Sequence, residues 1–150
     1  MYFALSINVN RPPADVFTFL RDKHAYPQEP GSPVLILDKT SPGPVRLGTH
    51  YREVVQMFPG IRGEILSEIT RYEPYSHLEE DFHGAGMEGH LAYEFIRDEK
   101  GTQLIQRYTL HARGLLKIIR PLMRWMLVPR LLERLETIKS VLESGWQEQP

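Results

Sequence analysis

The longest stretch of helical periodicity in the sequence is GLLKIIRPLMRWMLVPRLLERLETIKSVLES, residues 114–144. Its large apolar residues recur at steps of three and four, which places them in one stripe along a helix. The stripe consists of Leu116, Ile119, Met123, Leu127, Leu131, Leu135, Ile138 and Leu142. Each fully buried apolar side chain contributes about 1.5 to 3 kcal/mol to stability. The whole stripe would therefore contribute roughly 10 to 20 kcal/mol before the conformational entropy of ordering the segment is subtracted. The stripe therefore predicts that this helix packs against the rest of the chain.

Most of the chain before this helix has the period-two alternation of half-buried strands. The predicted strands cover residues 3–9, 34–40, 50–57, 61–72, 76–83, 89–97 and 102–112. Proline and glycine residues punctuate them at 41–44, 59–60, 73–74, 84–86 and 98–101. Short turns between successive strands indicate antiparallel pairing.

A short helix follows the first strand. Pro12 and Pro13 fit the first helical turn, where a missing amide donor costs little, and apolar residues at helical spacing follow over residues 14–22. The next stretch, residues 23–33, carries prolines at 27, 30 and 33, and we expect it to be irregular.

Length and composition favour one globular domain over residues 1–150, since 150 residues with 41% hydrophobic side chains form a core without disulfides or metals. The absence of cysteine fits a reducing compartment, and we expect the cytoplasm. The amino terminus lacks the features of a secretory signal, and no run is apolar enough to span a membrane. With 18 basic and 19 acidic residues, no global charge favours nucleic acid.

A series of strands followed by a long helix predicts an α+β fold, with an antiparallel sheet and its helices on one side. Several segments, in this order along nearly the whole chain, resemble the START-like helix-grip superfamily of polyketide cyclases, dehydrases and lipid transport proteins (SRPBCC type). These segments are NRPPADVFTFLRD at 10–22, VRLGTHYREVV at 45–55, ITRYEP at 69–74, GTQLIQRYTL at 101–110 and LERLETIKSVLE at 132–143.

The resemblance implies a deep, largely apolar cavity between a curved sheet of about seven strands and the last helix, suited to a hydrophobic ligand of lipid, polyketide or isoprenoid type. Strand parity and the helical stripe together select the residues expected to line it. They are Tyr51, Val55, Ile65, Ile69, Leu78, Glu80, Phe82, Tyr93, Phe95, Tyr108, Met123 and Leu127. Carriers, sensors and enzymes share this scaffold, so ligand binding without chemistry and a polyketide cyclase or dehydratase reaction both stay open.

For the enzyme alternative, the candidate catalytic residues are Glu80, Tyr93 and Tyr108. Glu80 shares its parity with Leu78 and Phe82, so an inward carboxylate with a pKa raised by desolvation is one interpretation, and a glutamate at the rim is the other. If it is such an acid, its replacement by glutamine leaves stability equal or higher near neutral pH. Either tyrosine could anchor a polar group of the ligand or pack in the core.

The sequence indicates no metal site and no cofactor. None of the six histidines, His24, His50, His77, His83, His90 and His111, has the spacing of a metal-binding pair. We expect His77 and His111 to be exposed on strands, and His50 and Arg52 to point outward.

The first part of the last helix is basic, since residues 113–132 carry five cations and no acid. Together with Trp125 and the apolar run after it, this pattern suits either a solvated basic face or a weak contact with an anionic membrane, the alternative of a peripheral lipid carrier. The protein is expected to be a monomer or a homodimer.

Two prolines interrupt this helix. Pro129 is predicted to bend or break it, because proline removes the amide that would bond the carbonyl of Trp125. Pro121 fits the first turn of the main helix, after a short separate turn, where no donor is missed.

Overall fold

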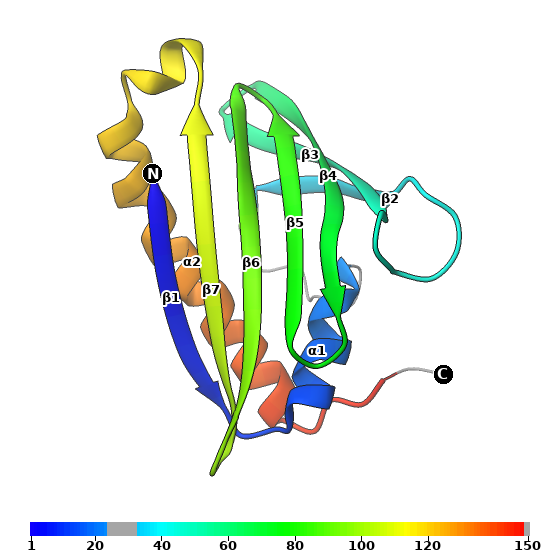
Figure 1. Cartoon of the computed structure of the whole chain (residues 1–150). Coiled ribbons are helices and arrows are strands. Elements are labelled where there is room, and N and C mark those ends of the chain that lie inside the picture. Colours follow the sequence, from blue (N-terminus) through cyan, green and yellow to red (C-terminus); the bar gives the residue numbers. More distant parts are fainter. Residues whose placement is uncertain (24–32, 149–150) are drawn as a thin grey trace.

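The computed structural model describes residues 1–23 and 33–148. A seven-stranded antiparallel sheet forms most of the molecule, and a long helix lies against one face of it (Figure 1). The strands are β1 (Tyr2–Val9), β2 (Val34–Lys39), β3 (His50–Phe58), β4 (Ile61–Glu73), β5 (His77–Gly84), β6 (Met87–Asp98) and β7 (Gly101–Ala112). The helices are α1 (Pro13–Arg21), the short 3₁₀-helix η2 (Gly114–Lys117) and α2 (Arg120–Glu143). The predicted α+β helix-grip fold is confirmed.

The strand order in the sheet is β1-β7-β6-β5-β4-β3-β2. Each strand from β2 to β6 therefore pairs with the next one along the chain, as the short turns predicted. β1 completes the sheet beside β7, with Tyr2 opposite Thr109 and Val9 opposite Thr102. The first and the last strand of the chain therefore lie side by side, with β1 at the edge of the sheet next to α2.

Register shifts bend the strands far from β1. They lie between Val34 and Ile36 in β2, Gln56 and Phe58 in β3, and Ile69 and Arg71 in β4. An extra residue on one strand increases the local twist and kinks the strand. The sheet is curved, and α1 and α2 lie on its inner face (Figure 1).

Helix α1 packs against one end of the sheet. It begins at Pro13, in the first turn as expected, and its buried apolar side chains are Val16, Phe17, Phe19 and Leu20. The ring of Phe17 meets those of Tyr72 and Phe95 edge to face, both at a centroid distance of 5.3 Å. Such pairs stabilise the packing beyond the area that they bury.

The predicted stripe of α2 is buried over only part of its length. Leu135, Ile138 and Leu142 are fully buried in the main core together with α1, whereas the stripe residues before them are only half-buried. The expectation that the whole stripe is buried is therefore wrong for its first half. There α2 lies beside the start of the edge strand β1, where Arg124 stands over the ring of Phe3, and the sheet offers fewer neighbours.

The carboxyl end of α2 is fixed by Arg11, which follows β1. Its guanidinium donates to the carbonyl oxygens of Leu142 at 2.6 Å and Trp146 at 2.9 Å. Helix ends leave carbonyls without helical donors, and a cation there also suits the helix dipole. Arg11 therefore holds the end of α2 against the first strand.

Both prolines lie inside α2. Pro121 occupies its first turn, after the separate turn η2, as predicted. The helix continues through Pro129 without a break, so of the two predicted outcomes the break is wrong and the bend stays a prediction. The packing of Leu135, Ile138 and Leu142 outweighs one lost hydrogen bond. Among the described residues, no helix is long and apolar enough to cross a membrane.

The predicted irregular segment 23–33 lies, except for its two ends, outside the described residues, as does His24.

Candidate functional site

The inner face of the sheet carries the side chains that strand parity selected. Buried there are Tyr51, Val55, Ile69, Leu78, Glu80, Phe82, Tyr93 and Phe95. Half-buried are Ile65, Tyr108, Met123 and Leu127. The alternation therefore placed these side chains on the right face, including the carboxylate of Glu80, which is not at an exposed rim.

A buried ion cluster lies among these apolar side chains. The Nζ atom of Lys23, just after α1, lies 2.8 Å from Oε2 of Glu80 and 3.1 Å from Oε1 of Glu53. It also donates to Oγ of Ser67 at 3.2 Å and stands 5.0 Å from the centre of the Tyr51 ring. We call Lys23, Glu53 and Glu80 the inner cluster.

Lys23 keeps its charge in this setting. Desolvation by burial works against the charged form, yet the Coulomb attraction of Glu80 and Glu53 outweighs it and raises the pKa of Lys23. The sequence left an inward Glu80 and a rim Glu80 open; the structure has the carboxylate inward, and it adds the pairing with Lys23, which the sequence did not show. Glu80 is half of an ion pair whose two side chains are only 12% and 13% exposed.

Two phenols lie on the same face. Burial raises the pKa of Tyr93 and that of Tyr108, so both stay protonated at neutral pH and keep a hydroxyl proton available for donation to a hydrogen bond. Tyr93 also experiences the charges of Arg134, Glu80 and Lys23.

Gln106 is the least expected member of this face. It lies directly opposite Tyr93 on β7 and is 1% exposed. Within the described part of the chain, neither the hydroxyl of Tyr93 nor the amide oxygen and nitrogen of Gln106 has a hydrogen-bond partner. A buried polar group without a partner costs about 1 to 3 kcal/mol, a cost that hydrogen bonds from water or from a ligand would remove.

A cavity of about 20 Å³ opens beside the inner cluster, enough for about one water molecule or one small polar group. The charged and phenolic residues of its lining come from four elements and the position after α1: Arg21 of α1, Lys23, Glu79 and Glu80 of β5, Tyr93 of β6, and Arg134 of α2. Its apolar lining consists of Leu20, Ile69, Leu78 and Leu91. The cavity therefore joins the polar groups of the inner face to its apolar surface.

Aromatic rings extend this apolar surface along the sheet. Phe82 lies over Gly89, where an added Cβ would stand 2.5 Å from the ring, so glycine permits the close approach. The ring of Phe82 then reaches Tyr108 at a centroid distance of 5.4 Å, and Tyr108 reaches Phe3 at 6.3 Å. These rings lead from the polar groups toward the first half of α2.

Sequence reasoning missed four polar residues on this face. Glu53, Ser67 and Gln106 were available from the same alternation that selected Tyr51, Ile69 and Tyr108, because they share those parities. Lys23 carried no such signal, since it belongs neither to a periodic helix nor to a strand.

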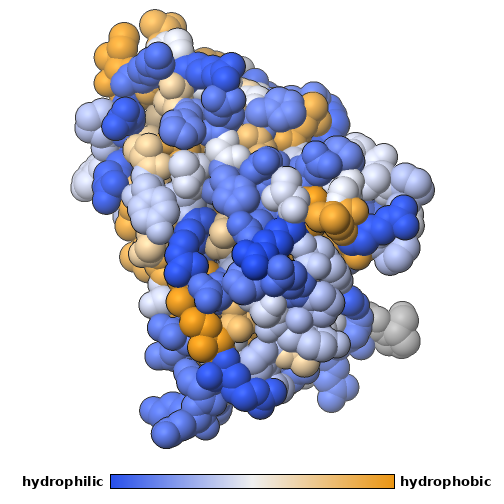
Figure 2. All heavy atoms as spheres, in the orientation of Figure 1, coloured by the Kyte–Doolittle hydropathy of each residue, from blue (hydrophilic) through white to orange (hydrophobic). Residues whose placement is uncertain are grey.

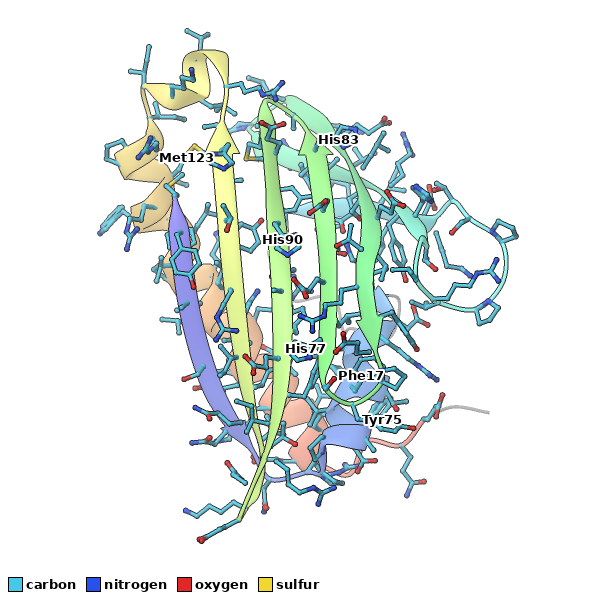
Figure 3. All side chains as sticks on the ribbon, in the orientation of Figure 1. Phe17, Tyr75, His77, His83, His90 and Met123 are labelled. Atoms are coloured by element: carbon cyan, nitrogen blue, oxygen red, sulfur yellow. The ribbon has the colours of Figure 1, made fainter. Side chains whose placement is uncertain are left out.

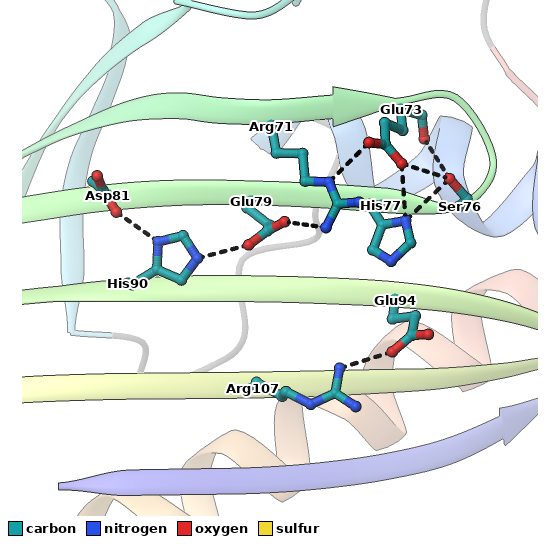
Figure 4. A network of polar contacts seen from close by, with 9 residues as sticks. All are labelled: Arg71, Glu73, Ser76, His77, Glu79, Asp81, His90, Glu94 and Arg107. Atoms are coloured by element: carbon teal, nitrogen blue, oxygen red, sulfur yellow. Dashed lines mark hydrogen bonds and ion pairs between the residues drawn. The ribbon is translucent and has the colours of Figure 1, made fainter.

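The opposite face of the sheet carries a separate, exposed polar network (Figure 4). His90 contacts Asp81 through Nδ1 and Glu79 through Nε2, the latter at 2.8 Å, and Arg71 contacts Glu79 at 3.0 Å. Desolvation lowers the pKa of His90, but the hydrogen bonds to Asp81 and Glu79 outweigh it and raise that pKa. His77 pairs with Glu73 on this side, and His50, Arg52 and His111 also point outward, as expected. The network faces away from α2, and of its residues Glu79 alone also belongs to the lining of the cavity.

Solved structures with the same fold include proteins from several bacteria. A protein of unknown function from Staphylococcus aureus has 15% identity and a TM-score of 0.73, with 99% of this chain and 96% of that chain covered. A protein from Thermus thermophilus has 15% identity and a TM-score of 0.71, with coverage of 97% and 100%. Ara h 8.0201 has 13% identity and a TM-score of 0.68, with coverage of 97% and 99%. At these identities the likeness shows the fold alone.

No curated protein matches the sequence. The family model described as polyketide cyclase / dehydrase and lipid transport matches residues 3–143, nearly the whole chain. With a curved sheet gripping a long helix around an inner face of apolar and phenolic side chains, the chain belongs to the polyketide cyclase / dehydrase and lipid transport family.

Proposed function

We propose that the protein binds a hydrophobic small molecule with a neutral carbonyl or hydroxyl group, between the inner face of the sheet and α2. The observation that carries the proposal is the pair of buried polar side chains, Tyr93 and Gln106, that lack hydrogen-bond partners among the described residues. A phenol and a carboxamide complement a neutral oxygen, since together they offer donors and an acceptor without charge.

The charges nearby support a neutral ligand. Lys23 already pairs with Glu80 and Glu53, so its charge is compensated and is not offered to a carboxylate ligand. The apolar body of the ligand, of lipid, polyketide or isoprenoid type, would lie along Phe82, Tyr108 and the half-buried side of α2 at Met123 and Leu127.

The test uses a neutral, ketone-bearing solvatochromic probe, 6-propionyl-2-dimethylaminonaphthalene. We expect saturable binding with a blue-shifted emission, and binding at least about tenfold weaker in Gln106→Leu, since the lost hydrogen bond is worth about 1.4 kcal/mol. In the free protein the same substitution should leave stability equal or higher, because it removes a buried polar group that has no partner among residues 1–23 and 33–148.

The matched control is Gln103→Leu. Gln103 lies on the same strand with the opposite parity, on the outer face, so its replacement should leave probe binding unchanged. Absence of saturable binding, or equal binding by both leucine variants, contradicts the proposal. Native mass spectrometry of the purified protein, with extraction of copurifying molecules, then identifies the natural ligand.

A second candidate function is a polyketide cyclase or dehydratase reaction, favoured by the presence of Glu80 and Tyr93 in one cavity lining. Glu80 would accept a proton from a carbon next to a ketone, and the protonated Tyr93 would donate a hydrogen bond to the resulting enolate oxygen. Lys23 would compensate the charge. Loss of turnover of a linear poly-β-ketone in Glu80→Gln, with retained probe binding, distinguishes this enzyme from a carrier.

A further inference from the structure

A group of large apolar side chains is exposed around the first half of α2. The exposed fraction is 83% for Leu115, 77% for Ile118, 50% for Leu122, 76% for Trp125 and 48% for Met126. Leu115 lies in η2, Ile118 between η2 and α2, and Leu122, Trp125 and Met126 in the first turns of α2; we call these five residues the apolar end surface.

This surface lies on the side of the helical segment that the sheet does not cover. The other side carries Leu116, Ile119, Met123 and Leu127, which are half-buried toward the sheet. The segment is therefore apolar on two sides, whereas a surface helix of a globular protein is polar on its outer side. The outer side of the second half of α2 is mostly polar, with Glu133, Glu136, Ser140 and Glu143 exposed and Leu132 as the one large apolar side chain exposed in residues 131–143.

Cations surround the apolar end surface. Lys117, Arg120, Arg124 and Arg130 are exposed, and residues 113–132 contain no acid. Arg113 pairs with Glu88, but for Lys117, Arg120 and Arg130 no carboxylate of residues 1–23 and 33–148 lies within ion-pair distance. The surface thus presents apolar side chains together with uncompensated positive charge.

The position of the surface favours a flat partner over one with a groove. Figure 1 shows η2 and the start of α2 at one end of the molecule, beyond the end of β7, and Figure 2 shows hydrophobic side chains gathered at this end. Figure 3 places Met123 there, far from Phe17 and Tyr75 at the opposite end. A protruding end with apolar tips and a basic rim suits insertion into the interface of an anionic bilayer.

We propose that the apolar end surface docks on an anionic lipid bilayer. Trp125, Ile118 and Leu122 enter the boundary between headgroups and acyl chains, and Lys117, Arg120 and Arg130 contact the lipid phosphates. A second copy of the chain fits less well, since a symmetric interface would bring the same uncompensated cations together. The proposal does not depend on the ligand bound in the interior.

The experiment measures binding of the full chain to vesicles of 70% phosphatidylcholine and 30% phosphatidylglycerol, and to vesicles of phosphatidylcholine alone. Trp125 reports insertion by a blue shift of its emission; Trp146→Phe removes the other tryptophan, which packs on Phe19. We expect binding to the anionic vesicles to be at least tenfold tighter than to the neutral ones, and to weaken with added salt.

Substitutions separate the apolar contribution to vesicle binding from the electrostatic contribution. Ile118→Ser with Leu122→Ser should weaken anionic vesicle binding at least tenfold, as should Lys117→Glu with Arg120→Glu. The matched controls are Leu47→Ser with Ile61→Ser, and Arg97→Glu with Lys100→Glu, which change exposed residues elsewhere and should alter binding less than twofold.

Three results would overturn the proposal. The first is no binding to anionic vesicles, and the second is equal binding to neutral ones. The third is a dimer in solution that Ile118→Ser with Leu122→Ser dissociates while vesicle binding is absent, which would make a second copy the occupant. Failure of the neutral probe to bind in the interior would contradict the proposed function and leave this one standing.

Discussion

The two halves of α2 belong to one helix yet meet different surroundings. Residues 131–143 bury Leu135, Ile138 and Leu142 against the core and are fixed at their end by Arg11. In residues 120–128 the same stripe is half-buried, and the apolar end surface on the other side is exposed. The comparison teaches that periodicity gives the direction of a helix face, whereas the depth of its burial depends on what lies beneath it.

The largest expected effect separates two leucines of α2. Leu135→Ala should lower the free energy of unfolding by about 2 to 5 kcal/mol, because it leaves a cavity in the core. Leu122→Ala should change it by less than about 0.5 kcal/mol, because this side chain is half exposed and leaves no cavity. Urea denaturation measures both values, and similar losses for the two variants would show that the halves are equally packed.

Pro129→Ala should stabilise the protein, by a gain approaching about 3 kcal/mol, because alanine restores an amide donor inside the helix. Pro121→Ala is the control, since Pro121 lies in the first turn, where no helical donor is missed. Thermal and urea denaturation report both. Equal changes in the two variants would mean that Pro129 does not weaken the junction between the halves.

Glu80→Gln should destabilise the closely packed end of the molecule by about 1.5 to 3 kcal/mol, since Lys23 keeps its charge and loses one of its two carboxylates. The sign is opposite to the one expected for an unpaired acid. Glu68→Gln, at an exposed site, serves as the control. A variant as stable as the parent protein would show that the ion pair with Lys23 contributes nothing.

Amide hydrogen exchange tests the comparison most finely. Amides of residues 120–128 should exchange at least about tenfold faster than those of residues 131–142, a difference of about 1.4 kcal/mol in opening free energy, since fewer buried contacts hold them. If an apolar ligand enters the interior past residues 120–128, the neutral probe should slow the exchange of these amides. Uniform slow exchange along α2 would instead indicate a rigid cover and entry elsewhere.

Much of the inner face was predictable because a strand allows only two directions for its side chains. One buried neighbour such as Leu78 or Phe82 therefore fixes the direction of Glu80 two residues away. The direction of Gln106 follows from the same rule, although Gln106 was not selected. The rule gives direction alone, so it did not show that Glu80 meets Lys23, nor that Gln106 and Tyr93 lack hydrogen-bond partners in the described part of the chain.

The sequence by itself determined the order of elements, the strand parities, the stripe of α2 and the harmless position of Pro121, because each depends on residues a few positions apart. Only the tertiary structure decided the ion pair of Lys23 with Glu80, the passage of α2 through Pro129 and the exposed apolar end surface. Each of these three features depends on segments that are distant along the chain. Packing of α2 on the sheet and α1 compensates the hydrogen bond lost at Pro129. Where α2 extends past the sheet and α1, this packing is absent and the apolar side chains stay exposed.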